Sequence, residues 1–230
     1  MSAPDLDARF YDEWVAMSRR LGVDPIDLAR VSFAETGMFR RHPRNPNAGV
    51  WPFIESTLHR QGWRGSALDF TAQDPVSQIL PWFEDYIRPY APLLRDDGMV
   101  YVAMFLPARL PAASQSDDSF VMTSRGDGTN FYEWNPILDR NADGVITVGD
   151  LRQHIDIQTQ GGGARWRTIE SELRARGAGR SPALVTAAHR NFVPIALAAT
   201  LLGAWYFYGN ADGQRLRQRA ERRVSRLIRV

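Results

Sequence analysis

The chain of 230 residues contains no cysteine and no lysine. Without cysteine the protein forms neither disulfide bonds nor a thiolate nucleophile, and the sequence leaves its redox compartment open. All 28 of its strongly basic residues are arginines, and 26 acidic residues leave a net charge of only +2. The first five residues contain neither a basic start nor an apolar run, so we expect no secretory signal.

The histidines do not predict a catalytic or metal site. Their positions show neither the spacing typical of zinc ligands nor the signature of a catalytic triad. We therefore expect them at surface or packing positions. They are His42, His59, His154 and His189.

Apolar periodicity and capping signals predict a mainly α-helical fold. The polar stretch 112–130 is a predicted linker or a β-hairpin around Asp127-Gly128, and the three glycines at 161–163 are a predicted flexible break. The predicted helices cover residues 5–21, 25–36, 52–61, 99–106 and 165–176, with another that begins at Asp74-Pro75 and kinks at Pro81.

Glu35 stands out because its local sequence favours a protonated carboxyl group. Asp24 and Pro25 are typical of a helix start, and Gly37 is typical of a helix end. Glu35 then lies in the last turn, where the negative end of the helix dipole disfavours a carboxylate. Nearby apolar residues such as Phe33 would add desolvation. Both effects raise the pKa of a carboxyl group and suit a general acid.

Residues from about Asp24 to Pro111 resemble the catalytic domain of bacterial and phage lytic transglycosylases. Glu35-Thr36-Gly37 matches their Glu-Ser/Thr-Gly motif, and residues 45–49 (Asn-Pro-Asn-Ala-Gly) match their Asn-Pro-Asn-like turn. Two later motifs differ, since Pro52 stands where the family has glutamine and residues 100–107 lack the Asn-Tyr pair. The resemblance implies a lysozyme-like α-helical domain.

The resemblance also implies an activity, the cleavage of the MurNAc–GlcNAc bond in peptidoglycan. It implies that Glu35 acts first as acid and then as base. The N-acetyl group and 6-hydroxyl of the substrate supply the remaining chemistry, whereas ordinary glycosidases need two carboxylates. Thr36 and Gly37 would support the turn beneath the acid, and three aromatic residues could line the sugar site or belong to the core. The expected substrate-binding set is Thr36, Gly37, Trp51, Phe53 and Tyr101.

Two alternatives to this activity stay open. Hydrolysis would need a second carboxylate, for which Asp69 and Asp74 are available, although Asp74 is better explained as a helix cap. The other alternative is a catalytically degenerate lysozyme-like module that binds peptidoglycan or has a structural role at a membrane. The two departures from the family motifs favour this second alternative.

Residues 139–150 fit the 12-residue EF-hand loop. Oxygen-bearing residues occupy the ligand positions, and Gly144 occupies the sixth position, where the chain must turn sharply. The last position holds aspartate instead of glutamate, so we expect weak Ca²⁺ binding with competition from Mg²⁺. Some lytic transglycosylases also carry such a loop. The alternative is a polar turn that needs no metal. The predicted ligands are Asp139, Asn141, Asp143, Val145 through its carbonyl, Thr147 and Asp150.

Residues 191–211 contain no charged side chain and are just long enough for a transmembrane helix. Aromatic residues cluster at one end, and residues 212–230 are rich in arginine with an apolar stripe. The charge asymmetry predicts a cytoplasmic tail and an outward-facing catalytic domain. A buried helix of a soluble domain is the alternative. Nucleic acid is not expected as a partner, because no base-reading motif accompanies the arginines.

These features predict a protein that acts on peptidoglycan from a membrane. The missing signal favours packaging in a phage virion, where phage proteins would be further partners; the alternative is a bacterial inner-membrane protein with a periplasmic domain. The predicted segments are 1–112 (lysozyme-like domain), 113–160 (linker and EF-hand-like loop), 161–190 (charged connector), 191–211 (transmembrane helix) and 212–230 (basic tail).

Overall fold

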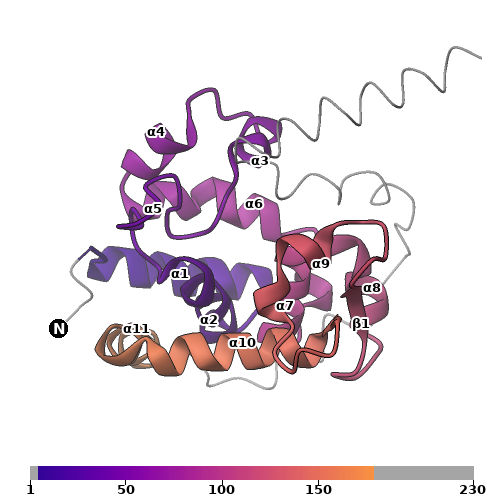
Figure 1. Cartoon of the computed structure of the whole chain (residues 1–230). Helices are drawn as coiled ribbons and strands as arrows, with labels where there is room; N and C mark the ends of the chain where they lie inside the picture. Colours follow the sequence, from indigo (N-terminus) through magenta and orange to yellow (C-terminus); the bar gives the residue numbers. More distant parts are fainter. Residues whose placement is uncertain (1–4, 179–230) are drawn as a thin grey trace, which may run out of the picture.

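The computed structural model describes residues 5–178. This part of the chain is mainly α-helical, as predicted, with one two-stranded sheet (Figure 1). The α-helices are α1 (Ala8–Leu21), α2 (Pro25–Thr36), α3 (Glu55–Arg60), α4 (Ala67–Ala72), α5 (Pro75–Gln78), α6 (Glu84–Ile87), α7 (Asp97–Phe105), α8 (Leu110–Ala113), α9 (Phe131–Trp134), α10 (Val148–Gly161) and α11 (Gly163–Ala175). The strands are β1 (Val121–Ser124) and β2 (Val145–Thr147), and shorter helical turns are Ile79–Phe83, Ala91–Leu93, Pro107–Arg109 and Pro136–Leu138.

The helix that carries Glu35 begins and ends where the sequence predicts. The Asp24 side chain caps α2 by accepting a hydrogen bond from the Ile26 amide at 2.8 Å, and Pro25 occupies the first turn. Gly37 ends the helix with a φ of 65°, and its amide donates to the Phe33 carbonyl at 2.8 Å. Glycine adopts this left-handed conformation without the steric penalty of a side chain.

One further prediction agrees with the structure and another does not. The helix that begins at Asp74-Pro75 kinks as predicted, because Leu80, which precedes Pro81, has φ −117° and ψ 120°. No hairpin forms around Asp127-Gly128; instead β1 pairs antiparallel with β2, with Ser124 opposite Val145. Asp127 accepts hydrogen bonds from neighbouring residues and so stabilises the connecting loop. The second half of the EF-hand-like loop is thereby attached to β1.

One continuous core runs through the part of the chain that the structure describes. Buried apolar side chains from Leu6 to Ala178 belong to a single cluster, and α10 packs against both α2 and α7. α11 contacts α1 and α2. In the view of Figure 1, α3 to α6 lie above α1, while α10 and α11 lie below it. Residues 113–175 therefore pack with the predicted lysozyme-like segment, and the predicted boundaries at 112 and 160 do not separate packing units.

No helix within residues 5–178 has both the length and the apolar composition needed to cross a bilayer. The predicted transmembrane helix 191–211 and the basic tail 212–230 lie outside the described residues.

Candidate functional site

Glu35 lies in the last turn of α2, with 26 % of its side chain exposed to solvent. This C-terminal end of α2 is the negative pole of the helix dipole. Two side chains from other helices approach its carboxyl group. The Tyr101 hydroxyl, on α7, donates a hydrogen bond to Oε1 of Glu35. Nε2 of His154, on α10, lies 4.0 Å from the same oxygen.

Tyr101 and His154 also contact each other where α2, α7 and α10 meet. The rings of Tyr101 and His154 meet edge to face, with centroids 5.9 Å apart and an interplanar angle of 78°. His154 is buried, with 8 % of its side chain exposed. Glu35, Tyr101 and His154 are far apart in sequence, so only the packing of the three helices brings them together.

The surroundings shift the pKa of Glu35 and the pKa of His154 away from their ordinary values. Burial raises the pKa of Glu35, and the hydrogen bond from Tyr101 opposes that rise without cancelling it. Burial lowers the pKa of His154 to about 4, and the positive charge of Arg140 acts in the same direction. Glu35 therefore holds its proton to a higher pH than an exposed glutamate. A neutral His154 leaves that proton in place, whereas an imidazolium would favour the carboxylate.

Thr36 and Gly37 form hydrogen bonds that hold the turn beneath Glu35. The Thr36 hydroxyl is buried and donates to the carbonyls of Ser32 at 2.9 Å and Val50 at 3.0 Å. It thus connects the end of α2 to the segment after the Asn-Pro-Asn turn. The Gly37 carbonyl accepts a hydrogen bond of 2.7 Å from Arg165 on α11. Through these hydrogen bonds, both residues fix the backbone next to Glu35.

The aromatic residues predicted to contact sugar lie in the core. Trp51 and Phe53 are 2 % and 5 % exposed, and the Trp51 ring lies 4.2 Å, centroid to centroid, from that of Phe83. Phe53 contacts Phe70 edge to face. Stacking on a sugar requires an exposed ring face, which neither residue offers in this structure. Tyr101 is also buried, and its hydroxyl contacts Glu35.

The structure shows two site residues that the sequence did not indicate. His154 was expected only at a surface or packing position, because its proximity to Glu35 depends on α10 folding back onto α2. Gln78 is buried beside the Asn-Pro-Asn turn, where its Oε1 accepts a hydrogen bond of 2.9 Å from the Val50 amide. Its Nε2 donates to the Arg40 carbonyl at 2.8 Å. No motif marks either residue in the sequence.

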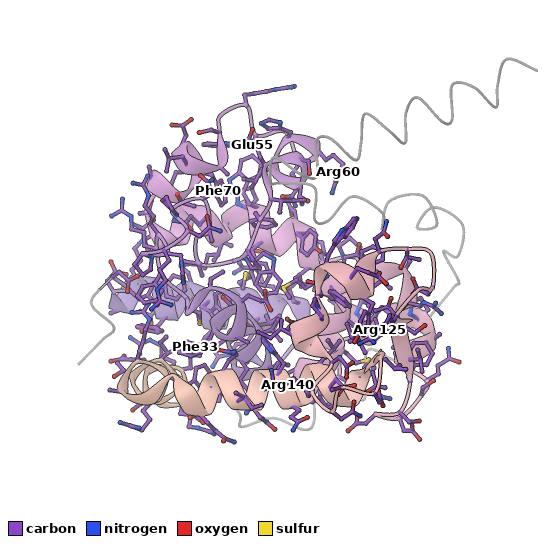
Figure 2. All side chains as sticks on the ribbon, viewed as in Figure 1. Phe33, Glu55, Arg60, Phe70, Arg125 and Arg140 are labelled. Atoms are coloured by element: carbon purple, nitrogen blue, oxygen red, sulfur yellow. The ribbon has the colours of Figure 1, made fainter. Side chains whose placement is uncertain are left out.

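The predicted cation loop turns sharply at Gly144, where the EF-hand pattern requires a turn. Gly144 has a φ of 88° and Ala142 a φ of 60°, so the chain turns sharply at the fourth and sixth positions. Oδ2 of Asp139 accepts the Gly144 amide at 2.9 Å and the Tyr132 hydroxyl at 2.6 Å. Asp143 accepts the Val145 amide at 2.9 Å through Oδ1. The loop then leads directly into α10, and Figure 2 shows Arg140 beside that helix.

The donor set of this loop fits a hard cation. Asp139 and Asp150 are buried and form no ion pair within residues 5–178, and a buried carboxylate without a partner charge is unfavourable. The Tyr132 hydroxyl, aided by loop amides, holds the pKa of Asp139 below its ordinary value, so this group is ionised at neutral pH. Asp150 instead accepts hydrogen bonds from the amide and hydroxyl of Thr147 at 2.9 and 2.6 Å.

Carboxylates alone do not make up a metal site in the part of the chain that the structure describes. Among the described residues, no three His, Cys, Asp or Glu side chains converge in an arrangement that holds a metal ion. Asn141, Thr147 and the Val145 carbonyl would have to complete the ligand set, as the EF-hand pattern predicts.

No protein family, no curated protein and no solved structure matches this chain.

Proposed function

We propose that this chain is a peptidoglycan lytic transglycosylase that cleaves the MurNAc–GlcNAc bond with Glu35 as its single acid and base. The observation that carries the proposal is the environment of Glu35. This carboxyl group lies at a helix end, has a raised pKa, keeps part of its surface open to solvent and accepts a hydrogen bond from Tyr101. The motif residues Thr36 and Gly37 hold the turn beneath it.

The proposed reaction has two proton transfers. Neutral Glu35 gives its proton to the glycosidic oxygen as the bond from that oxygen to C1 breaks, and the N-acetyl group of the substrate stabilises the cation that develops. The Glu35 carboxylate then takes the proton of the 6-hydroxyl as O6 bonds to C1. The products are a 1,6-anhydro end and a free hydroxyl, Glu35 regains its proton, and no water is consumed.

The remaining parts of the chain would position this reaction. A Ca²⁺ ion in the loop 139–150 would supply positive charge between the loop carboxylates and fix the start of α10. The segment 191–211 and the tail 212–230 would anchor the protein at a membrane, with a phage virion as the proposed source and a bacterial inner membrane as the alternative.

One observation favours a second candidate, a degenerate module that binds peptidoglycan without cleaving it. Trp51 and Phe53, the aromatic residues predicted to contact sugar, are buried, and Pro52 replaces the glutamine of the family. A protein that retained the fold and lost part of the sugar site would have these features.

A digest of purified peptidoglycan separates the candidates. The full-length chain, Glu35→Gln and the control Glu170→Gln are each incubated with peptidoglycan in Ca²⁺, and released muropeptides are identified by mass spectrometry. Glu170 is a suitable control because it also lies on a helix and is 31 % exposed, in an ion pair with Arg174 on the surface.

The expected result is anhydro-muramyl ends from the wild type and Glu170→Gln, and none from Glu35→Gln. Reducing ends would indicate hydrolysis and a second catalytic group. Binding without release by the folded wild-type protein would overturn the enzyme proposal in favour of the degenerate module.

A further inference from the structure

Two side chains converge on one oxygen of the Glu35 carboxyl group. Tyr101 donates its hydroxyl hydrogen to Oε1, and Nε2 of His154 lies 4.0 Å from the same atom. A hydrogen bond from nitrogen to oxygen needs about 2.7–3.2 Å, so His154 is about 1 Å beyond hydrogen-bonding distance. With both neighbours at Oε1, Oε2 is the oxygen left to exchange a proton with a substrate.

The imidazole of His154 is able to donate to Glu35. Burial keeps the ring neutral at physiological pH, since it lowers the pKa of His154 to about 4. A neutral imidazole carries one N–H, on either nitrogen. Nδ1 of His154 has no hydrogen-bond partner within residues 5–178, so no contact there holds the hydrogen on that nitrogen. Nε2 can therefore carry it.

The helix that bears His154 is fixed on both sides of this residue. Arg152 binds Asp96 at 2.8 Å and Asp118 at 2.9 Å. Asp156 pairs with Arg30 of α2. These ion pairs hold the backbone of α10 against α2 and α7, so closing the gap between His154 and Glu35 requires movement of their side chains and not of the helices.

We propose that His154 is a positioning residue for Glu35. After Glu35 has given its proton to the glycosidic oxygen, the Nε2–H of His154 closes on Oε1, joins the Tyr101 hydroxyl there and holds the carboxylate until Oε2 takes the proton of the 6-hydroxyl. This role rests on the proposed transglycosylase function. It follows from the burial of His154, from its unpaired Nδ1 and from its approach to the oxygen that Tyr101 already contacts.

Three variants of the full-length chain test the proposal. His154→Phe keeps a ring of similar size without the N–H, and His154→Gln keeps an N–H donor. Gln153→Ala is the control, because Gln153 is the exposed neighbour of His154 on α10. We expect His154→Phe to lower kcat for muropeptide release by about 10–100-fold, with KM changed less than about twofold. This loss is smaller than the roughly 10²–10⁴-fold that a direct proton-transfer group contributes, because His154 acts through Glu35. His154→Gln should recover most of kcat, and Gln153→Ala should match the wild type.

A second readout does not depend on turnover. The Glu35 carboxyl carbon is followed by NMR as a function of pH in the ¹³C-glutamate-labelled full-length protein, with Glu35→Gln to assign the signal. Loss of a donor to the carboxylate should raise the measured pKa of Glu35 in His154→Phe, and His154→Gln should restore the wild-type value. If His154→Phe does not fold, the test uses His154→Gln alone. Its kcat and the pKa of Glu35 should then stay close to the wild-type values, and a clear departure of both would overturn the proposal.

The two readouts separate the two proposals. Unchanged kcat and unchanged Glu35 titration in His154→Phe would overturn the positioning role while leaving the transglycosylase proposal intact. A second outcome is that the wild type releases no muropeptides while the pKa of Glu35 still changes in His154→Phe. This result would overturn the proposed function and support the contact between His154 and Glu35. Equal loss in His154→Phe and His154→Gln would assign His154 to packing alone and overturn the proposal.

Discussion

His154 should make the protein lose stability as the pH falls below neutral. In the unfolded chain its pKa is the ordinary 6.5, whereas burial lowers it to about 4 in the folded state. Between these values the unfolded state binds a proton that the folded state does not, so acidification favours unfolding. The loss begins near the unfolded pKa and is complete below the folded pKa.

The size of this effect follows from the two pKa values. One pKa unit corresponds to about 1.4 kcal/mol, so the shift is worth about 3 kcal/mol below pH 4 and about 2 kcal/mol at pH 5. His154→Gln cannot titrate and should lose this dependence. The difference between wild-type and variant free energies of unfolding should therefore change by about 2 kcal/mol between about pH 7.5 and about pH 5.

Urea unfolding of both proteins, followed by tryptophan fluorescence at several pH values, measures this difference. Groups that titrate equally in both proteins cancel from it. His59→Gln is the matched control, because His59 lies exposed on α3. Parallel stability curves for wild type and His154→Gln across this pH range would refute the reasoning, since they would mean that His154 titrates alike in the folded and unfolded states.

Gly162→Ala should lower the free energy of unfolding by about 1–3 kcal/mol through overpacking, because a Cβ there would lie 2.3 Å from the Phe33 ring. Gly161→Ala, with open space around it, should change it by less than about 1 kcal/mol, and equal urea midpoints for the two variants would contradict this geometry. Asp27→Asn should stabilise the protein by roughly 2–4 kcal/mol at about pH 8 and not at about pH 4. Burial and neighbouring carboxylates raise the pKa of Asp27 to about 7, so the folded state carries an unfavourable charge above that pH. An equal gain at both pH values in urea unfolding would exclude this cause. Ca²⁺ at about ten times its Kd should stabilise the wild type by about 1.4 kcal/mol and leave Asp139→Asn unchanged in Tm, whereas the same response in both would place the ion elsewhere.

Signals that act within a few residues were sufficient to predict much of the helical structure. The caps at Asp24 and Gly37 fixed both ends of α2, because a side chain that accepts an amide hydrogen bond and a glycine in the left-handed region are local features. The same holds for the turn at Gly144, where the loop pattern predicts the backbone. These are the positions at which sequence and structure agree most closely.

Predictions that depended on distant packing fared differently. The sequence could not show that β1 would pair with β2 instead of forming a hairpin, because register depends on which strand the fold brings alongside. It also left Trp51 and Phe53 open as core or sugar-binding residues, since burial is decided by other helices. The three glycines at 161–163 do interrupt the helix, since α10 ends at Gly161 and α11 begins at Gly163. The sequence could not show that Gly162 packs against the Phe33 ring.

α10 connects the two motifs that the sequence presents separately. It begins in the cation loop and carries Asp150, the last predicted ligand, and His154 follows one helical turn later beside Glu35. A turn of helix spans about 5.4 Å, and its hydrogen bonds make that span stiff. A change in the position of Asp150 would therefore move His154 as well. The loop and the acid share one element, so an ion at 139–150 would act on the separation between His154 and Glu35 without contacting a substrate.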